Sequence, residues 1–128
     1  MPFSVLIVDD CPAMQTVIRR ILGISGFDLE ACYFAADGSE ALSMLRRHTV
    51  DLVISDVNMP KLDGEAMLRC LAEDEKLRKV PVVMVSSDGT RSRVDRLVGM
   101  GAKGYIVKPF QPAALRAELE RVLEVSHA

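Results

Sequence analysis

Short apolar runs alternate with amphipathic segments along the whole chain, and this alternation narrows the folds that the sequence can adopt. Runs rich in β-branched residues predict buried strands at 3–8, 30–35, 51–56, 80–85 and 104–107. Each run is followed by a segment whose apolar residues recur at the spacing of one helix face. Strands that alternate with helices form parallel sheets covered on both faces. The sequence therefore predicts a three-layer α/β fold around a five-stranded parallel sheet.

The predicted helices carry starts and stops that fit this interpretation. In the first helix, the apolar stripe consists of Met14, Val17, Ile18, Ile21 and Leu22. Pro12 precedes that stripe, where the first turn of a helix tolerates proline, and Gly26 supplies the stop. Asp37, followed three residues later by Glu40, predicts a capping-box start for the second helix. Three more helices are predicted, at about 64–72, at about 92–100 and from position 112 to about position 125.

Size and composition exclude several classes of protein. A chain of 128 residues is long enough for one hydrophobic core, so we expect a single domain over residues 1–128. The formal net charge of −2 gives no basic excess for direct binding to nucleic acid. The apolar run at 80–85 is too short to cross a bilayer, and the N-terminus has no signal-peptide pattern. Three widely spaced cysteines suggest neither a disulfide framework nor a zinc site, so we expect a cytoplasmic protein without membrane contact.

Polar residues follow four of the predicted strands, at the edge where parallel sheets bind ligands. The first strand ends in Asp9 and Asp10, and the third ends in Asp56. The fourth strand ends in Ser86 and the fifth in Lys108. Any one of these residues alone is best explained as a solvated strand end. Three carboxylates, a hydroxyl and an ammonium group at one edge are much harder to explain by chance, so we interpret them as a site.

The chemistry of this set favours a hard cation and a phosphoryl group. Three neighbouring carboxylates raise one another's pKa unless a cation lies between them. Mg²⁺ accepts one or two protein carboxylates, keeps several waters and binds phosphate oxygens. A carboxylate beside Mg²⁺, such as Asp56, can act as a nucleophile towards phosphorus and form an aspartyl phosphate. Lys108 and the Ser86 hydroxyl are then available to the added phosphoryl oxygens.

These residues resemble the receiver domain of bacterial two-component response regulators. The resemblance rests on Asp9-Asp10, 56-DVNMPKLDG-64, Ser86 and 104-GYIVKPF-110, which occur in the family's order and at close to its spacing. It extends from about position 3 to about position 123 and is most similar to the stand-alone chemotaxis regulators of that family. It implies a doubly wound, flavodoxin-like (βα)5 fold with strand order 2-1-3-4-5.

The resemblance also implies a phosphoacceptor and a metal site. Asp56 would accept the phosphoryl group from a sensor histidine kinase and would later lose it by slow hydrolysis that the chain itself assists. Asp10 would bind Mg²⁺ directly, and Asp9 would act largely through a bound water. Asp56 and the backbone carbonyl of Asn58 would complete the protein's share of the metal ligands.

The same resemblance implies a switch. Lys108 would contact the phosphoryl group and precede a cis peptide bond to Pro109. Ser86 would be the switch hydroxyl and Tyr105 the switch aromatic. A downstream protein partner would bind the surface of the fourth helix, fifth strand and fifth helix. The fourth helix has a basic side formed by Arg91, Arg93 and Arg96, for which exposure to solvent is the default interpretation.

Three alternatives and two details stay open from the sequence. The chain could be a receiver-like scaffold that is never phosphorylated. A haloacid-dehalogenase-like Mg²⁺ phosphatase would need its nucleophile after the first strand, and a flavin-binding electron carrier would need a phosphate-binding loop there instead of Asp9-Asp10-Cys11-Pro12. Ser87 stands where the family usually has alanine, so either of two adjacent hydroxyls could switch, although the spacing to Lys108 favours Ser86. Cys11, next to the acidic pair, is interpreted as a tolerated loop residue because nearby carboxylates raise the pKa of a thiol.

Overall fold

The computed structural model describes the backbone of residues 2–127 and the side chains of residues 2–124. Its strands are β1 (Phe3–Val8), β2 (Leu29–Ala35), β3 (Leu52–Asp56), β4 (Val82–Ser86) and β5 (Gly104–Val107). Its helices are α1 (Pro12–Ile24), α2 (Gly38–Arg47), α3 (Gly64–Ala72), α4 (Arg91–Gly99) and α5 (Pro112–His127), with a 3-10 turn at Leu77–Lys79. Among these described elements, no helix combines the length and the apolar character needed to span a bilayer.

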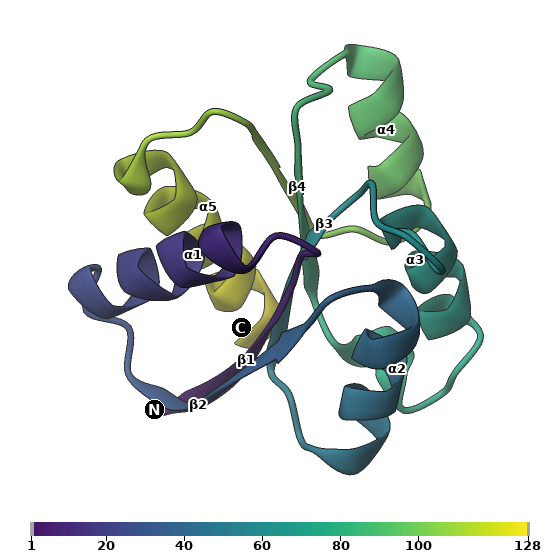
Figure 1. Cartoon of the computed structure of the whole chain (residues 1–128), viewed down its shortest axis with the longest axis horizontal. Helices are drawn as coiled ribbons and strands as arrows, with labels where there is room; N and C mark the ends of the chain where they lie inside the picture. The colour runs from purple at the N-terminus through teal and green to yellow at the C-terminus, as the bar shows by residue number, and fades with distance from the viewer. Residues whose placement is uncertain (1, 128) are drawn as a thin grey trace.

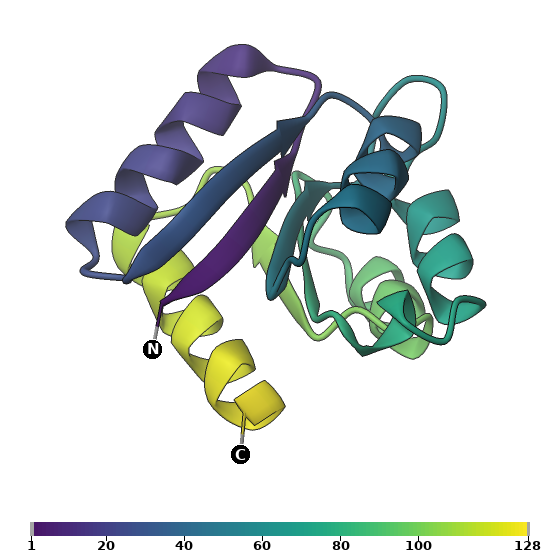
Figure 2. The same ribbon diagram turned by 90° about the horizontal axis from the view of Figure 1, so that it is seen from below.

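The five strands form one parallel sheet in the order β2-β1-β3-β4-β5. Figure 1 shows α1 and α5 on one side of this sheet and α2, α3 and α4 on the other. The view from below shows the same three layers (Figure 2). The predicted fold class and strand order are therefore confirmed. Because β2 and β3 lie on opposite sides of β1, strand order reverses there, and the carboxyl ends of β1 and β3 border the switch point.

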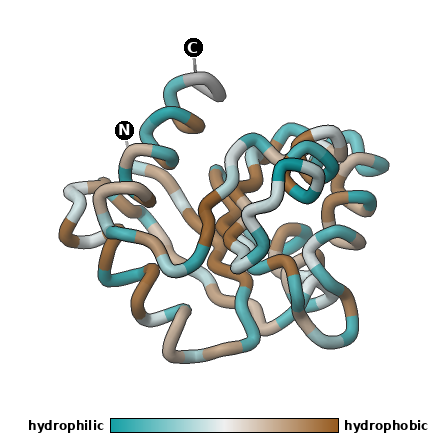
Figure 3. The backbone as a smooth tube through the Cα atoms, turned by 90° about the horizontal axis from the view of Figure 1, so that it is seen from above, coloured by the Kyte–Doolittle hydropathy of each residue, from teal (hydrophilic) through white to brown (hydrophobic). Residues whose placement is uncertain are grey.

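The core consists of two apolar layers, one on each face of the sheet. On one face, Ile7 and Ile54 pack with Ile18 of α1 and Leu119 of α5. On the other face, the strand residues that alternate with these, such as Leu6, pack among residues of α2, α3 and α4. The central strands are therefore apolar on both faces, as expected for a parallel sheet between helices. Figure 3 shows this as a hydrophobic centre within a more hydrophilic periphery.

The local signals for helix starts are mostly confirmed. α1 begins at Pro12, and the Asp37 side chain accepts a hydrogen bond from the Glu40 N–H at 2.9 Å at the start of α2. Gly26 has the positive φ of a helix stop, +81°. The predicted stripe of α1 is only partly buried, because Ile18, Ile21 and Leu22 face the sheet whereas Val17 is 46% exposed. β4 begins two residues later than predicted because Pro81 has no N–H to donate to a neighbouring strand.

Candidate functional site

The polar strand ends predicted from the sequence meet at the carboxyl edge of the sheet. Asp9 follows β1 directly, Asp56 is the last residue of β3, Ser86 is the last of β4 and Lys108 follows β5. Their strands are parallel neighbours, so the four ends come together without any long loop having to carry a side chain into place. The position of the site is thus a direct result of the topology.

Three carboxylates form the centre of the site. Oxygens of Asp9, Asp10 and Asp56 all lie within 4.8 Å of one another. Asp9 is buried, Asp56 is half-buried and Asp10 is exposed, so the cluster runs from the core to the surface. The Lys108 Nζ lies 3.5 Å from Asp56 Oδ1 and 3.8 Å from Asp9 Oδ2. The single ammonium group offsets only part of the negative charge.

The hydrogen bonds of Asp9 show that the cluster fits a further cation. Its Oδ1 accepts the Cys11 N–H at 2.9 Å. Its Oδ2 is, among the described residues, the one buried side-chain oxygen or nitrogen without a hydrogen-bond partner. Burial raises the pKa of Asp9, and the charges of Asp56 and Asp10 raise it further, against the opposing effects of the Cys11 N–H and Lys108. Oxygen ligands alone, one of which accepts no hydrogen bond, suit a hard cation such as Mg²⁺.

The carboxylate of Asp56 is held by its own loop. The Val57 N–H donates to Asp56 Oδ1 at 2.8 Å, and the Ser55 hydroxyl donates to the Asp56 carbonyl at 2.8 Å. The loop then returns to the sheet, where the Gly64 N–H donates to the Val57 carbonyl at 2.8 Å. A Cβ at Gly64 would lie 2.6 Å from the Asp56 carbonyl oxygen. Glycine at this position therefore lets the first turn of α3 pack directly on the backbone of Asp56.

The Ser86 hydroxyl and Tyr105 both contact the loop after β4. Ser86 is buried, and its Oγ accepts the Asp88 N–H at 3.1 Å. The half-buried Tyr105 donates its hydroxyl to the Asp88 carbonyl at 2.6 Å. Asp88 also accepts from the backbone and side chain of Thr90, and these hydrogen bonds lower the pKa of Asp88. The two predicted switch residues are thus connected through one backbone segment.

Three further predictions concern the peptide bond before Pro109, the position of Asn58 and the choice between Ser86 and Ser87. The peptide bond between Lys108 and Pro109 is cis, as the resemblance implied. Asn58 is exposed two residues after Asp56, and the role of its carbonyl stays a prediction. Ser87 is exposed beside the buried Ser86, which agrees with Ser86 being the inward hydroxyl of the pair.

One supporting residue was not predicted from the sequence. Gln15 of α1 donates from Nε2 to the carbonyl of Asp9 at 2.7 Å and more weakly to that of Ala35 at 3.4 Å. This side chain fixes the turn between β1 and α1, and therefore the backbone of the acidic pair. A glutamine within a helix gives no signal for this role, because its partners lie in two other segments of the chain.

Comparisons with known proteins agree with this geometry. The family model of the response regulator receiver domain matches residues 5–120. The chain belongs to this family. It is 37% identical to the chemotaxis protein CheY of Pseudomonas aeruginosa over 121 residues, which cover 94% of this chain and 96% of the relative. It is 36% identical to CheY-3 of Vibrio cholerae over 121 residues, covering 94% and 92% of the two chains.

Solved receiver domains have the same fold. The response regulator CheY4 of Vibrio cholerae superposes with a TM-score of 0.85 at 30% identity, covering 95% of this chain and 99% of that one. The signal receiver domain of a histidine kinase from Syntrophus aciditrophicus gives a TM-score of 0.84 at 32% identity, covering 96% and 91%. This chain is therefore a receiver domain of the CheY type, and its family places it in two-component signalling.

Proposed function

We propose that this receiver domain accepts a phosphoryl group on Asp56 in a Mg²⁺-dependent reaction and thereby switches a partner-binding surface. The observation that carries the proposal is the position of Asp56 at the tip of β3. There it shares a cluster with Asp9 and Asp10, and its carboxylate lies 3.5 Å from the Lys108 ammonium group. Nucleophile, metal ligands and phosphoryl-binding cation are thus provided by one rigid sheet edge.

In the proposed reaction, an Asp56 carboxylate oxygen forms a bond to phosphorus, and the bond from phosphorus to the donor nitrogen breaks. The donor is a phosphohistidine of a sensor kinase, and its imidazole keeps the electron pair of the broken bond and takes up a proton. Asp9, Asp10, Asp56 and the Asn58 carbonyl would hold Mg²⁺, which when bound neutralises the carboxylates and polarises the phosphoryl oxygens. Lys108 supplies a fixed positive charge to the same oxygens. Attack of water on the acyl phosphate would later regenerate the Asp56 carboxylate.

The switch in this proposal passes through Ser86. Its oxygen accepts the Asp88 N–H, and its own proton is left to donate to a phosphoryl group on Asp56, so a turn of Ser86 towards that group would pull on the Asp88 backbone. Tyr105 follows because its hydroxyl is bonded to the same residue. The added charge of about −1.5 to −2 supplies the driving force for this rearrangement. The output would be a changed surface of α4, β5 and α5, read by a downstream protein, and residues 1–128 would act as one receiver domain.

Amide NMR with Mg²⁺ and beryllofluoride, a mimic of the aspartyl phosphate, tests the proposal. The chain contains no tryptophan, so backbone amides are a better readout than intrinsic fluorescence. We expect saturable shifts at residues 56–58, 86–88 and 105–108 only when both components are present. Asp56→Asn should abolish them. The proposal is wrong if the wild type shows no such shifts, or if Asp56→Asn shows the same ones.

A further inference from the structure

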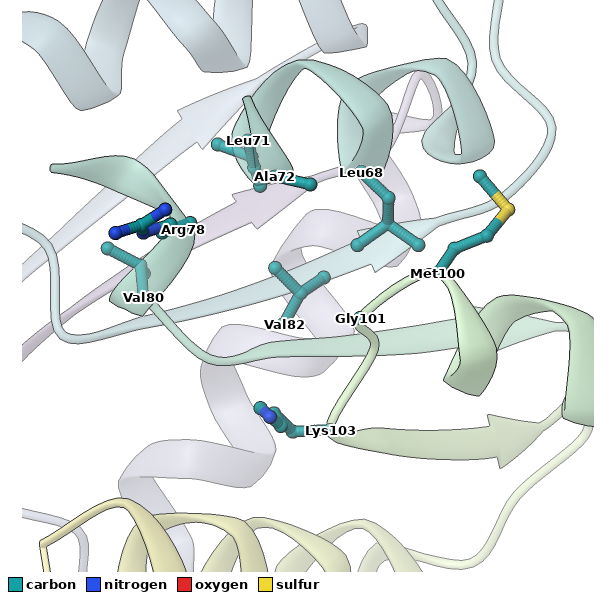
Figure 4. Close-up of a pocket in the computed structure, with 9 residues that line it drawn as sticks. All are labelled: Leu68, Leu71, Ala72, Arg78, Val80, Val82, Met100, Gly101 and Lys103. Carbon is teal, nitrogen blue, oxygen red and sulfur yellow. The ribbon is translucent and has the colours of Figure 1, made fainter. Parts of the chain in front are cut away.

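Helix α4 is held to the rest of the molecule by little apolar contact. Of its nine residues, only Leu97 is buried, and Val98 is 49% exposed. A hollow of about 240 Å³ lies between the second half of α3 and the turn that follows α4. Figure 4 shows Leu68 and Leu71 of α3 on one side of this hollow and Met100 and Gly101 on the other. Apolar packing alone therefore positions α4 weakly.

An ion cluster supplies the missing attachment. Glu65 lies in the first turn of α3, and its side chain is only 13% exposed. Arg93 of α4 approaches its Oε2 at 3.5 Å, and both Nε and Nη2 of Arg96 contact its Oε1. Arg69 of α3 lies 3.7 Å from the same carboxylate. Glu65 and Arg93 are partly buried whereas Arg96 is 58% exposed, and charges joined in a network hold geometry better than an isolated surface pair does. We call Glu65, Arg93 and Arg96 the α3–α4 clasp.

The clasp lies between the two loops of the phosphorylation site. Glu65 directly follows Gly64, whose N–H donates to the Val57 carbonyl in the loop after Asp56. Arg93 lies in the first turn of α4, directly after the loop that holds Ser86 through the Asp88 N–H. The loop after β4 cannot release Ser86 and move unless the start of α4 moves with it or the chain between them distorts.

We propose that Glu65 is a positioning residue that sets the balance of the switch. By holding Arg93 and Arg96, it favours the conformation in which Ser86 is bonded to Asp88, and it opposes the movement of Ser86 towards Asp56. This inference rests on the proposed phosphorylation of Asp56. Weakening the clasp should make that movement easier, so binding of a phosphoryl mimic should become tighter rather than weaker.

The variant Glu65→Gln tests this with little change in shape. Glu73→Gln is the matched control, since it makes the same chemical change at the exposed end of α3, two turns away from the clasp. Two quantities are measured: amide hydrogen exchange of α4 without Mg²⁺ or beryllofluoride, and the apparent affinity for beryllofluoride at saturating Mg²⁺. For Glu65→Gln we expect faster exchange in α4 and an affinity about three- to tenfold higher than wild type. For Glu73→Gln we expect the exchange rates of α4 and the affinity for beryllofluoride to equal those of wild type.

A double-mutant cycle separates the clasp from a general loss of stability. Arg96→Gln should raise the affinity in the same direction, and Glu65→Gln combined with Arg96→Gln should add little to either single change. Unchanged or lower affinity in Glu65→Gln, or full additivity in the cycle, would overturn the inference while leaving the proposed function intact. Absence of any beryllofluoride response in the wild type would overturn the proposed function, and the inference with it.

Discussion

At the scale of single residues, burial of the Asp9 carboxylate opposes folding of the metal-free chain. Asp9 is 2% exposed, one of its oxygens accepts no hydrogen bond, and its pKa is raised chiefly by burial. A carboxyl group with a raised native pKa binds its proton more tightly in the folded state than in the unfolded chain. The carboxyl group of Asp9 therefore has no effect on the free energy of unfolding below its usual pKa of 3.8. As the pH rises from there through the native pKa, ionisation of Asp9 destabilises the fold.

The change Asp9→Asn should stabilise the metal-free fold by about 1 kcal/mol at pH 7, because it removes a buried charge that lacks full compensation. Urea unfolding of the variant and the wild type in EDTA measures the difference. The gain should shrink as the pH is lowered towards 3.8 and below, where the wild-type carboxyl is itself protonated. Equal stabilities at pH 7 would contradict this account of Asp9.

Some residues of the site could be predicted from the sequence and others could not, for a physical reason. Asp9, Asp56 and Lys108 end strands whose parallel direction brings every carboxyl end to one edge. Gln15 and Glu65 act through contacts with other elements, and a local pattern does not encode those contacts. The basic side of α4 is solvated at Arg91 and Arg96, as the default interpretation held. Arg93 departs from it, since its side chain is 26% exposed and paired with a residue 28 positions earlier.

At the scale of elements, the contact between α3 and the loop after β3 is unusually close. A Cβ at Gly64 would lie 2.6 Å from both the Asp56 carbonyl oxygen and the Met84 Cε. We expect Gly64→Ala to cost about 1–3 kcal/mol of stability and to slow the modification of Asp56, because α3 must move away from that backbone. Gly23→Ala is the control, since a Cβ there meets no atom within 4 Å.

Urea unfolding and the rate of phosphorylation by acetyl phosphate provide the two readouts. Gly23→Ala should be neutral or stabilising by about 0.5–1 kcal/mol, as expected for glycine replaced within a helix. If Gly64→Ala behaved like Gly23→Ala in both measurements, the proposed tight packing at Asp56 would be wrong.

Besides the apolar packing of Ile106 with α5, one carboxylate of α5 bonds to the edge strand β5. Glu118 Oε2 accepts the Tyr105 N–H at 3.0 Å, and Arg121 donates to Glu118 Oε1 at 2.7 Å and to the Lys103 carbonyl at 2.9 Å. Burial alone would raise the pKa of Glu118, but these hydrogen bonds and the charge of Arg121 together hold it below the usual 4.5. Its contribution to stability is therefore present above pH 4.5 and lost as the pH falls through the native pKa.

Glu118→Gln should destabilise the fold by about 1 kcal/mol at pH 7, since the amide weakens both charge-assisted hydrogen bonds. The difference from wild type, measured by urea unfolding over a series of pH values, should diminish below pH 4.5. A difference that stayed constant down to the lowest pH would indicate that shape, rather than charge, secures β5.

At the scale of the whole molecule, the alternation of strands and helices was enough to predict three layers and a parallel sheet. The strand order came from the resemblance to receiver domains and is confirmed by the pairing of the strands. The start of β4 was predicted less accurately than the strand order, because the apolar pattern continues through Pro81, which has no N–H for strand pairing. The sparse apolar packing of α4 was not predictable, because its few apolar residues fit the helical period whether or not they are buried.

The proposal that Asp56 is phosphorylated is tested most directly by intact-mass spectrometry after incubation with acetyl phosphate and Mg²⁺. We predict a gain of one phosphoryl mass that is stable to acid, labile to base, absent in EDTA and absent in Asp56→Asn. Lys108→Ala should reduce the yield by removing the cation nearest the acceptor carboxylate. An adduct that persists in Asp56→Asn, or no adduct in the wild type, would contradict the central claim.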